Sequence, residues 1–138
     1  MKKKLLVALM LIFLTIGLFA TFALSADVPG MTKDELKAML GNSDLVIFDV
    51  RMGSDYFSSD LKIKGAVRPP DMGHVTPTQF STDVRDLRDK TFVFYCACPN
   101  EVTSVGIAQL FIRTGFKVFV LKGGWEEWLK ANYPTEKK

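Results

Sequence analysis

The stretch FVFYCACPNEVTS, residues 92–104, contains the clearest evidence for the fold of this chain. Its first four residues form a continuous apolar run, which is typical of a strand buried in a parallel sheet. From Val102 to Thr114 apolar side chains recur at helical spacing, and Gly115 follows in the position of a helix C-cap. The sequence therefore predicts a strand, a turn that contains two cysteines, and a helix, in that order.

The same alternation of strands and helices continues on both sides of this stretch. Apolar runs at 45–50 and 118–121 predict two more buried strands. Helices are expected after the capping box Thr32–Glu35 and at 125–132. This order predicts an α/β fold with a central, mostly parallel β-sheet flanked by helices on both faces.

The carboxyl ends of the predicted strands carry the residues best suited to a binding site. Ligands of parallel sheets bind beyond these ends. The residues that follow the three runs are Asp49-Val50-Arg51, Cys96-Ala97-Cys98 and Gly123-Gly124. We expect them to converge on one site.

The first 26 residues differ in composition from the rest of the chain. Lys2, Lys3 and Lys4 precede a run without charged side chains, residues 5–26, that ends in small residues. This order is typical of a secretory signal peptide, and its length also fits an uncleaved anchor that crosses the membrane through residues 5–24. In both cases residues 27–138 form one exported domain, periplasmic or otherwise extracytoplasmic, and free or membrane-anchored.

The charge balance of residues 27–138 excludes one class of partner. Of the 18 basic residues in the chain, Lys2, Lys3 and Lys4 come before this part, so 15 basic side chains face 15 acidic ones. A domain without net charge lacks the excess of positive charge that attracts nucleic acid. We expect a monomer that binds no nucleic acid.

The two cysteines, Cys96 and Cys98, lie one residue apart. A bridge across so short a loop constrains the unfolded chain very little, so we interpret the pair as chemical rather than structural. Together with the single histidine, His74, they fall short of the four ligands of a structural zinc site. We therefore expect no metal centre.

The order and spacing of several short motifs resemble those of the rhodanese-like domains, over about residues 31–134. These motifs are Phe48-Asp49-Val50-Arg51, Ile63-Lys64-Gly65-Ala66-Val67, Val93-Phe94-Tyr95-Cys96, Gly115-Phe116, Leu121-Lys122-Gly123-Gly124-Trp125 and Tyr133-Pro134. The resemblance implies a single-domain sulfurtransferase without a cofactor. In such an enzyme a cysteine thiolate takes a sulfane sulfur from thiosulfate, a polysulfide or a persulfide, and the resulting cysteine persulfide passes it to cyanide or a thiol.

The resemblance leaves two alternatives for the nucleophile. Counting forward along the strand places Cys96 at that position, whereas counting back from Gly115-Phe116 places Cys98 there. We expect Cys96, because the strand fixes its position. Cys98 is then the alternative nucleophile, or a second thiol that resolves the persulfide or forms an easily reduced bridge with Cys96.

A loop between the strand and the helix is expected to bind the substrate and the persulfide. Backbone amides at the start of the helix would lower the pKa of the thiol and hold the persulfide anion. The resemblance also implies that Asp49 and Arg51 support this loop through hydrogen bonds. The loop residues are Ala97, Cys98, Pro99, Asn100, Glu101, Val102, Thr103 and Ser104.

Other functions are weighed against this one. A phosphatase of the Cys-x5-Arg type is excluded, because Val102 and Ser104 stand six positions after the two cysteines. An exported thiol-disulfide redox protein remains an alternative, as does a non-catalytic rhodanese-like module that binds a partner or carries sulfur.

Glu101 would repel dianionic thiosulfate, so we expect a less charged donor.

Overall fold

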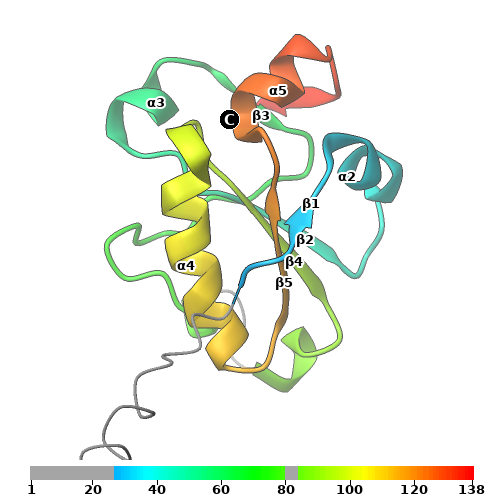
Figure 1. Cartoon of the computed structure of the whole chain (residues 1–138), viewed down its shortest axis with the longest axis vertical. Coiled ribbons are helices and arrows are strands. Elements are labelled where there is room, and N and C mark those ends of the chain that lie inside the picture. Colours follow the sequence, from blue (N-terminus) through cyan, green and yellow to red (C-terminus); the bar gives the residue numbers. More distant parts are fainter. Residues whose placement is uncertain (1–26, 80–83) are drawn as a thin grey trace, which may run out of the picture.

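The computed structural model describes residues 27–79 and 84–138. Its central sheet has four strands in the order β1-β5-β4-β2, and every neighbouring pair is parallel (Figure 1). The prediction of an α/β fold with a parallel central sheet is confirmed. The strands are β1 (Gly30–Met31), β2 (Leu45–Asp49), β4 (Thr91–Tyr95) and β5 (Lys117–Leu121).

Helices cover both faces of the sheet, as predicted. Helix α4 (Val102–Arg113) lies on one face, whereas α2 (Lys33–Met39) and α5 (Gly124–Lys130) lie on the other (Figure 1). The remaining helical elements are short. They are α3 (Gly53–Phe57), η1 (Pro77–Gln79), η2 (Val84–Leu87) and η3 (Pro99–Glu101).

The core is divided into two halves by the alternation of side chains along β4. Phe92 and Phe94 point towards α4, where the Phe111 ring lies 5.0 Å from that of Phe94. Val93 and Tyr95 point to the opposite face, towards α2 and α5. Because successive side chains of a strand alternate between faces, Cys96 continues the α4 side, where it is buried.

The start of α2 is the capping box that the sequence predicts. The Thr32 hydroxyl accepts a hydrogen bond from the Glu35 amide at 3.2 Å, and Glu35 Oε2 accepts one from the Thr32 amide at 2.7 Å. Met31 and Leu36, on either side of the cap, are buried in the same half of the core.

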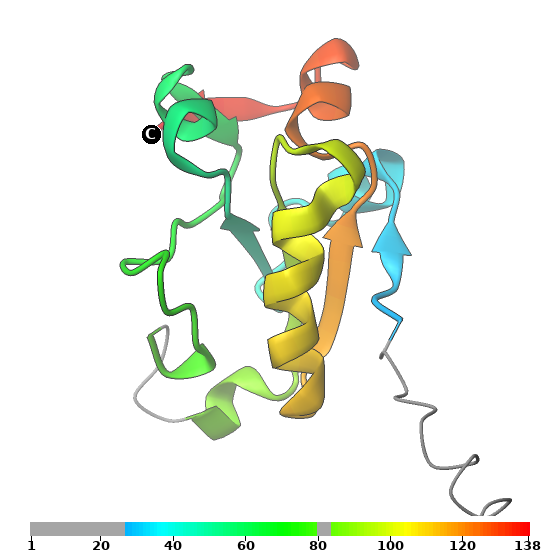
Figure 2. The ribbon, with the colours of Figure 1, turned by 60° about the vertical axis from the view of Figure 1, so that its left-hand side comes forward.

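A second, two-stranded sheet was not predicted. Strand β3 (Leu61–Ile63) pairs antiparallel with β6 (Thr135–Lys137). Figure 2 shows β6 beside the part of the chain that carries α3, to one side of the central strands. This pairing ties the segment after β2 to the segment after α5.

The proposed export segment, residues 1–26, lies outside the described residues. Within residues 27–79 and 84–138, no helix combines the length and apolar character needed to cross a membrane.

Candidate functional site

The two cysteines lie in the turn between β4 and α4, and a disulfide joins them. Their Cα atoms are 5.6 Å apart. Cys96 is 2% exposed and directly continues β4, whereas Cys98 is half-buried and immediately precedes η3. A bridge was one of the two roles that the sequence allowed for Cys98 as a second thiol.

The sulfur of Cys98 faces a backbone amide at the start of α4. Thr103 N–H donates to Cys98 Sγ at 3.4 Å. An amide in the first turn of a helix has no partner within the helix, so it is free to hold a sulfur atom that carries negative charge. This contact provides, for Cys98, the environment that the sequence analysis expected for the nucleophile.

The backbone of the loop bends through two consecutive left-handed residues. Asn100 has φ 53° and Glu101 has φ 52°, and neither is a glycine. Asparagine adopts this conformation with little cost, but glutamate seldom does. The Glu101 carboxylate compensates, because its Oε1 accepts the Gly123 N–H at 2.8 Å and so ties the loop to the neighbouring turn.

That neighbouring turn, Gly123-Gly124, packs directly against the cysteine loop. Both glycines have positive φ, and a Cβ on Gly124 would collide with the carbonyl oxygen of Cys96. The next amide, of Trp125, donates to the same oxygen at 2.9 Å. The close approach of the two loops therefore requires glycine at position 124.

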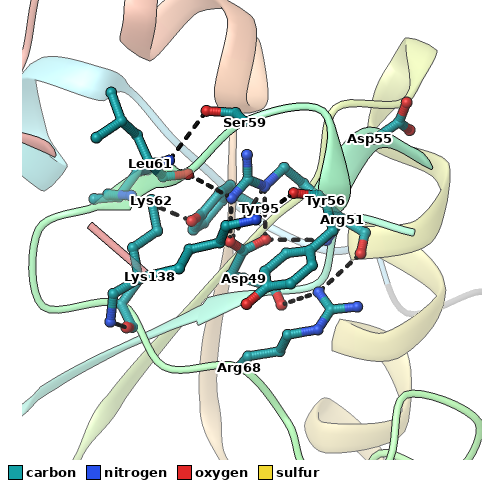
Figure 3. Close-up of polar contacts among 12 residues, drawn as sticks. Asp49, Arg51, Asp55, Tyr56, Ser59, Leu61, Lys62, Arg68, Tyr95 and Lys138 are labelled. Carbon is teal, nitrogen blue, oxygen red and sulfur yellow. Dashed lines mark hydrogen bonds and ion pairs between the residues drawn. The ribbon is translucent and has the colours of Figure 1, made fainter. Parts of the chain in front are cut away.

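Asp49 and Arg51 form a fully buried ion pair (Figure 3). Arg51 Nη2 lies 2.6 Å from Asp49 Oδ2, and Arg51 Nε donates to Asp49 Oδ1 at 2.9 Å. Burial alone would lower the pKa of Arg51, but the hydrogen bonds and the charge of Asp49 outweigh it and raise that pKa. Arg51 is therefore a buried cation under the site.

Arg51 connects the ion pair to the cysteine loop through an aromatic ring. Its guanidinium carbon lies 4.2 Å from the centroid of the Trp125 ring, and Trp125 is the residue whose amide holds the Cys96 carbonyl. Arg51 Nη2 also donates to the Leu61 carbonyl at 2.9 Å. Asp49 and Arg51 thus reach the loop indirectly and touch neither cysteine by a hydrogen bond among the described contacts.

A second arginine and a tyrosine complete this layer. Arg68 Nη1 donates to the Arg51 carbonyl at 2.9 Å, and its guanidinium lies 3.7 Å from the centre of the Tyr56 ring (Figure 3). Lys138 Nζ lies 3.9 Å from the same ring and donates to the Tyr56 carbonyl at 2.7 Å.

An open pocket of about 300 Å³ lies over the cysteine loop. Its lining contains three carboxylates and no basic side chain. Two of them, Glu126 and Glu127, come from the first turn of α5, and the third is Glu101. The lining residues are Cys96, Ala97, Cys98, Pro99, Asn100, Glu101, Gly123, Glu126 and Glu127.

The structure brings most of the predicted loop to this pocket, but not its last three residues. Val102 is 66% exposed, Thr103 turns its amide to Cys98, and Ser104 is fully buried. None of the three lines the pocket. In the part of the chain that the structure describes, Ser104 Oγ and Arg51 Nη1 are buried without a hydrogen-bond partner.

Glu126 and Glu127 were missed by the sequence analysis. The signal was present, because they follow Gly123-Gly124 at the carboxyl end of a predicted parallel strand. Among the described residues, no group of three or more His, Cys, Asp or Glu side chains is placed to hold a metal ion.

Comparison with known proteins identifies the same family as the sequence motifs. The family model described as Rhodanese-like domain matches residues 32–131. A curated relative, thiosulfate sulfurtransferase GlpE of Glaesserella parasuis, is 28% identical over 109 residues, which cover 77% of this chain and 91% of the relative.

Solved structures with similar folds include proteins from two other bacteria. A protein from Bacillus halodurans has a TM-score of 0.61 and 26% identity, covering 79% of this chain and 77% of that one. A protein from Rhodopseudomonas palustris, described as of unknown function and a possible tyrosine phosphatase, has a TM-score of 0.58 and 28% identity, covering 79% and 85%.

Proposed function

Because this chain belongs to the rhodanese-like domain family, we propose that it is a sulfurtransferase that moves a sulfane sulfur through a persulfide on the Cys96–Cys98 loop. The observation that carries the proposal is the contact between the Thr103 amide and the sulfur of Cys98, a residue that lines an open pocket. A thiolate at this place is stabilised by the start of α4 and is open to a donor from solvent.

We assign the nucleophile to Cys98 and the second thiol to Cys96. The sequence favoured Cys96, but two features support the alternative. Cys98 is half-buried, whereas Cys96 is almost completely buried, with an exposed fraction of 2%. In addition, the Thr103 amide in the first turn of α4 donates a hydrogen bond to the sulfur of Cys98. A donor can therefore approach Cys98 more readily, and its thiolate is the better stabilised of the two.

The proposed reaction has two steps and starts from the reduced protein. The Cys98 thiolate attacks the outer sulfur of a donor R–S–SH, forming Cys98–S–SH and releasing R–S⁻. A nucleophilic acceptor then takes the outer sulfur and restores the Cys98 thiolate; with cyanide the product is thiocyanate. The Thr103 amide stabilises negative charge on sulfur in both steps.

The carboxylates around the pocket support a donor with little negative charge. Two charges 4 Å apart interact by about 1 kcal/mol in water, and thiosulfate would meet this repulsion from Glu101, Glu126 and Glu127. The ammonium nitrogens of Lys33 and Lys130 lie 4.0 Å and 3.5 Å from the Glu127 carboxylate, so they reduce the repulsion that Glu127 contributes. A low-molecular-weight persulfide or a polysulfide is the donor class that this charge pattern favours.

The test is cyanide-dependent formation of thiocyanate by the reduced full-length chain. The wild type and Cys96→Ser should be active, and Cys98→Ser inactive. Thiocyanate formation by Cys98→Ser but not by Cys96→Ser would move the nucleophile to Cys96. Equal activity of both variants, or no thiocyanate from the wild type and from either variant with any sulfane donor, would refute the proposed function.

A thiol-disulfide redox protein is the second candidate, and the Cys96–Cys98 disulfide favours it. Such a protein would exchange this bridge with substrate thiols without gaining a sulfur atom. Intact mass after incubation with a sulfane donor distinguishes the two functions, since only a sulfurtransferase gains the mass of one sulfur.

The place of action is also a proposal. Residues 1–26 would export the domain as a signal peptide or as a membrane anchor. Cell fractionation, with sequencing of the mature amino terminus, tests this. A full-length chain recovered from the cytoplasm would refute it.

A further inference from the structure

The position of Cys96 beside the nucleophile adds a reaction to the one above. We propose that Cys96 resolves the Cys98 persulfide within the same chain, so that the domain acts as a persulfide reductase that releases hydrosulfide and closes the Cys96–Cys98 disulfide. This inference rests on the proposed function, because it needs Cys98 to accept a sulfane sulfur first.

The two sulfur atoms are bonded to each other in this structure, so this conformation of the loop brings them within bonding reach. The disulfide between them is present in a loop whose backbone is held on several sides. The Cys96 carbonyl accepts the Trp125 amide at 2.9 Å, and the Glu101 carboxylate anchors the far side of the loop to Gly123 at 2.8 Å. A thiolate on Cys96 is thus positioned beside Cys98 Sγ, which gives the attack the advantage of an intramolecular reaction.

The difference in exposure assigns separate roles to the two thiols. Cys96 is 2% exposed and belongs to the core cluster on the α4 side, so a solvent donor or acceptor has little access to it. Both cysteines line the pocket, and Cys98, which is half-buried, is the more exposed of the two. The donor therefore loads Cys98, and the partner in direct reach of that sulfur is Cys96.

The reaction balances as a two-electron reduction of the sulfane sulfur. Loading gives Cys98–S–SH from the Cys98 thiolate and R–S–SH, with release of R–S⁻. The Cys96 thiolate then attacks Cys98 Sγ, the S–S bond to the outer sulfur breaks, and HS⁻ leaves as the Cys96–Cys98 bond forms. The outer sulfur gains two electrons, and the thiol pair loses two.

The pocket favours the departure of the product. HS⁻ leaves into a space lined by Glu101, Glu126 and Glu127 and by no basic side chain, so an anion is not retained there. The same carboxylates leave the neutral disulfide undisturbed, because it carries no charge.

The cycle requires a dithiol reductant from outside the chain. Its first thiolate attacks the more exposed sulfur, that of Cys98, and Cys96 leaves as a thiolate. Its second thiol then attacks the mixed disulfide and releases the Cys98 thiolate, to which Thr103 donates its amide hydrogen bond. The reductant is oxidised to a disulfide, and the pair is ready for another donor.

The experiment is a single turnover of the full-length chain, reduced with a dithiol that is then removed. The persulfide of 2-mercaptoethanol, whose organic group carries no charge, is added at one equivalent, hydrosulfide is trapped with a bimane reagent, and the intact mass of the chain is measured. The wild type should release one hydrosulfide per chain, lose the mass of two hydrogens, and stop until a dithiol is added. Cys96→Ser should gain one sulfur atom and keep it, and Cys98→Ser gives the background release.

Two different failures are distinguishable. If the wild type keeps the added sulfur as stably as Cys96→Ser, the reductase inference is wrong while sulfur transfer stands, provided that cyanide still removes that sulfur as thiocyanate. If no variant gains sulfur and no thiocyanate forms, the proposed function itself is wrong. Should Cys96→Ser not fold by circular dichroism, Cys96→Ala and a peptide map of the wild type, which separates disulfide from persulfide at residue 98, decide the question.

Discussion

The amide of Trp125 donates a hydrogen bond to the carbonyl oxygen of Cys96, with N and O 2.9 Å apart. This single contact joins the amino end of α5 to the end of β4. Because the Trp125 ring in turn lies 4.2 Å from the guanidinium of the buried Arg51, the cysteine loop is supported from below by a layer that extends to Asp49. The chemistry of the loop should therefore be sensitive to changes that touch neither sulfur atom.

The first prediction concerns the close approach at Gly124. Gly124→Ala places a Cβ against the Cys96 carbonyl and keeps an unfavourable positive φ of 49°. We expect a loss of roughly 1–3 kcal/mol of unfolding free energy in denaturant melts, together with a loss of most thiocyanate formation. Gly41→Ala is the matched control, since Gly41 also has a positive φ but its Cβ would meet nothing within 4 Å. If both variants lose the same activity, the contact with Cys96 is irrelevant to the site.

The second prediction concerns the buried ion pair. Arg51→Met leaves the Asp49 carboxylate buried without its partner, which should cost about 3–5 kcal/mol in chemical denaturation. The double variant Asp49→Leu with Arg51→Met should be more stable than the single one, because it removes the unpaired charge. Lys130→Met, which removes the exposed pair with Glu127, is expected to change stability by less than about 1 kcal/mol. A double variant less stable than Arg51→Met would contradict this account.

The two-residue strand β1 was missed, but the sequence predicted the other three strands of the central sheet, because most of their residues are buried. Such strands appear as continuous apolar runs, and the predicted limits at 92–95 and 118–121 each fall one residue short of the observed β4 and β5. Strand β3 escaped notice for the opposite reason. It has three residues, of which Leu61 is exposed, and its partner β6 lies more than 70 positions away, so no local pattern marks the pair.

The site was harder to predict than the sheet, and the reasons are specific. Arg51 resembles a surface charge in the sequence, but the structure buries it completely against Asp49 and Trp125. The sharp turn at Asn100 and Glu101 is made by left-handed residues without the glycine that usually signals one, so no pattern predicted the path of the loop. The choice of nucleophile stayed open because counting forward along the strand and counting back from Gly115-Phe116 point to different cysteines.

The third prediction tests the charge of the pocket. Glu126→Gln removes one carboxylate from the lining while Glu101 keeps its contact with Gly123. The KM for thiosulfate should fall about fivefold, as expected for the removal of about 1 kcal/mol of repulsion, and kcat/KM for a neutral persulfide donor should stay unchanged. Asp89→Asn is the control, because Asp89 is an exposed residue in the turn before β4, at the opposite end of that strand. An equal effect of both variants would mean that only net charge matters.

The fourth prediction concerns stability at high pH. Burial raises the pKa of Tyr95 well above its ordinary value of 10.0, so the folded state holds this proton more tightly than the unfolded state does. The stabilisation is fully present below about pH 10 and is lost as the pH rises above it, because the unfolded chain then releases the proton and the folded one does not. In urea melts, the unfolding free energy of the wild type should fall between pH 10 and higher pH by up to about 1.4 kcal/mol per unit from this group alone.

Tyr95→Phe removes the ionisable proton, so the unfolding free energy of this variant should depend less steeply on pH above pH 10. It also removes the hydroxyl that accepts the Ile63 amide at 3.3 Å, so the variant starts less stable at neutral pH and approaches the wild type as the pH rises. Tyr133→Phe is the comparison, since a hydrogen bond to Asp34 raises the pKa of Tyr133, which is only half-buried. Because solvent screens the Tyr133 hydroxyl, Tyr133→Phe should change the slope of the unfolding free energy against pH less than Tyr95→Phe does. A Tyr95→Phe variant with the full wild-type slope would show that the buried hydroxyl does not control the alkaline limit of the fold.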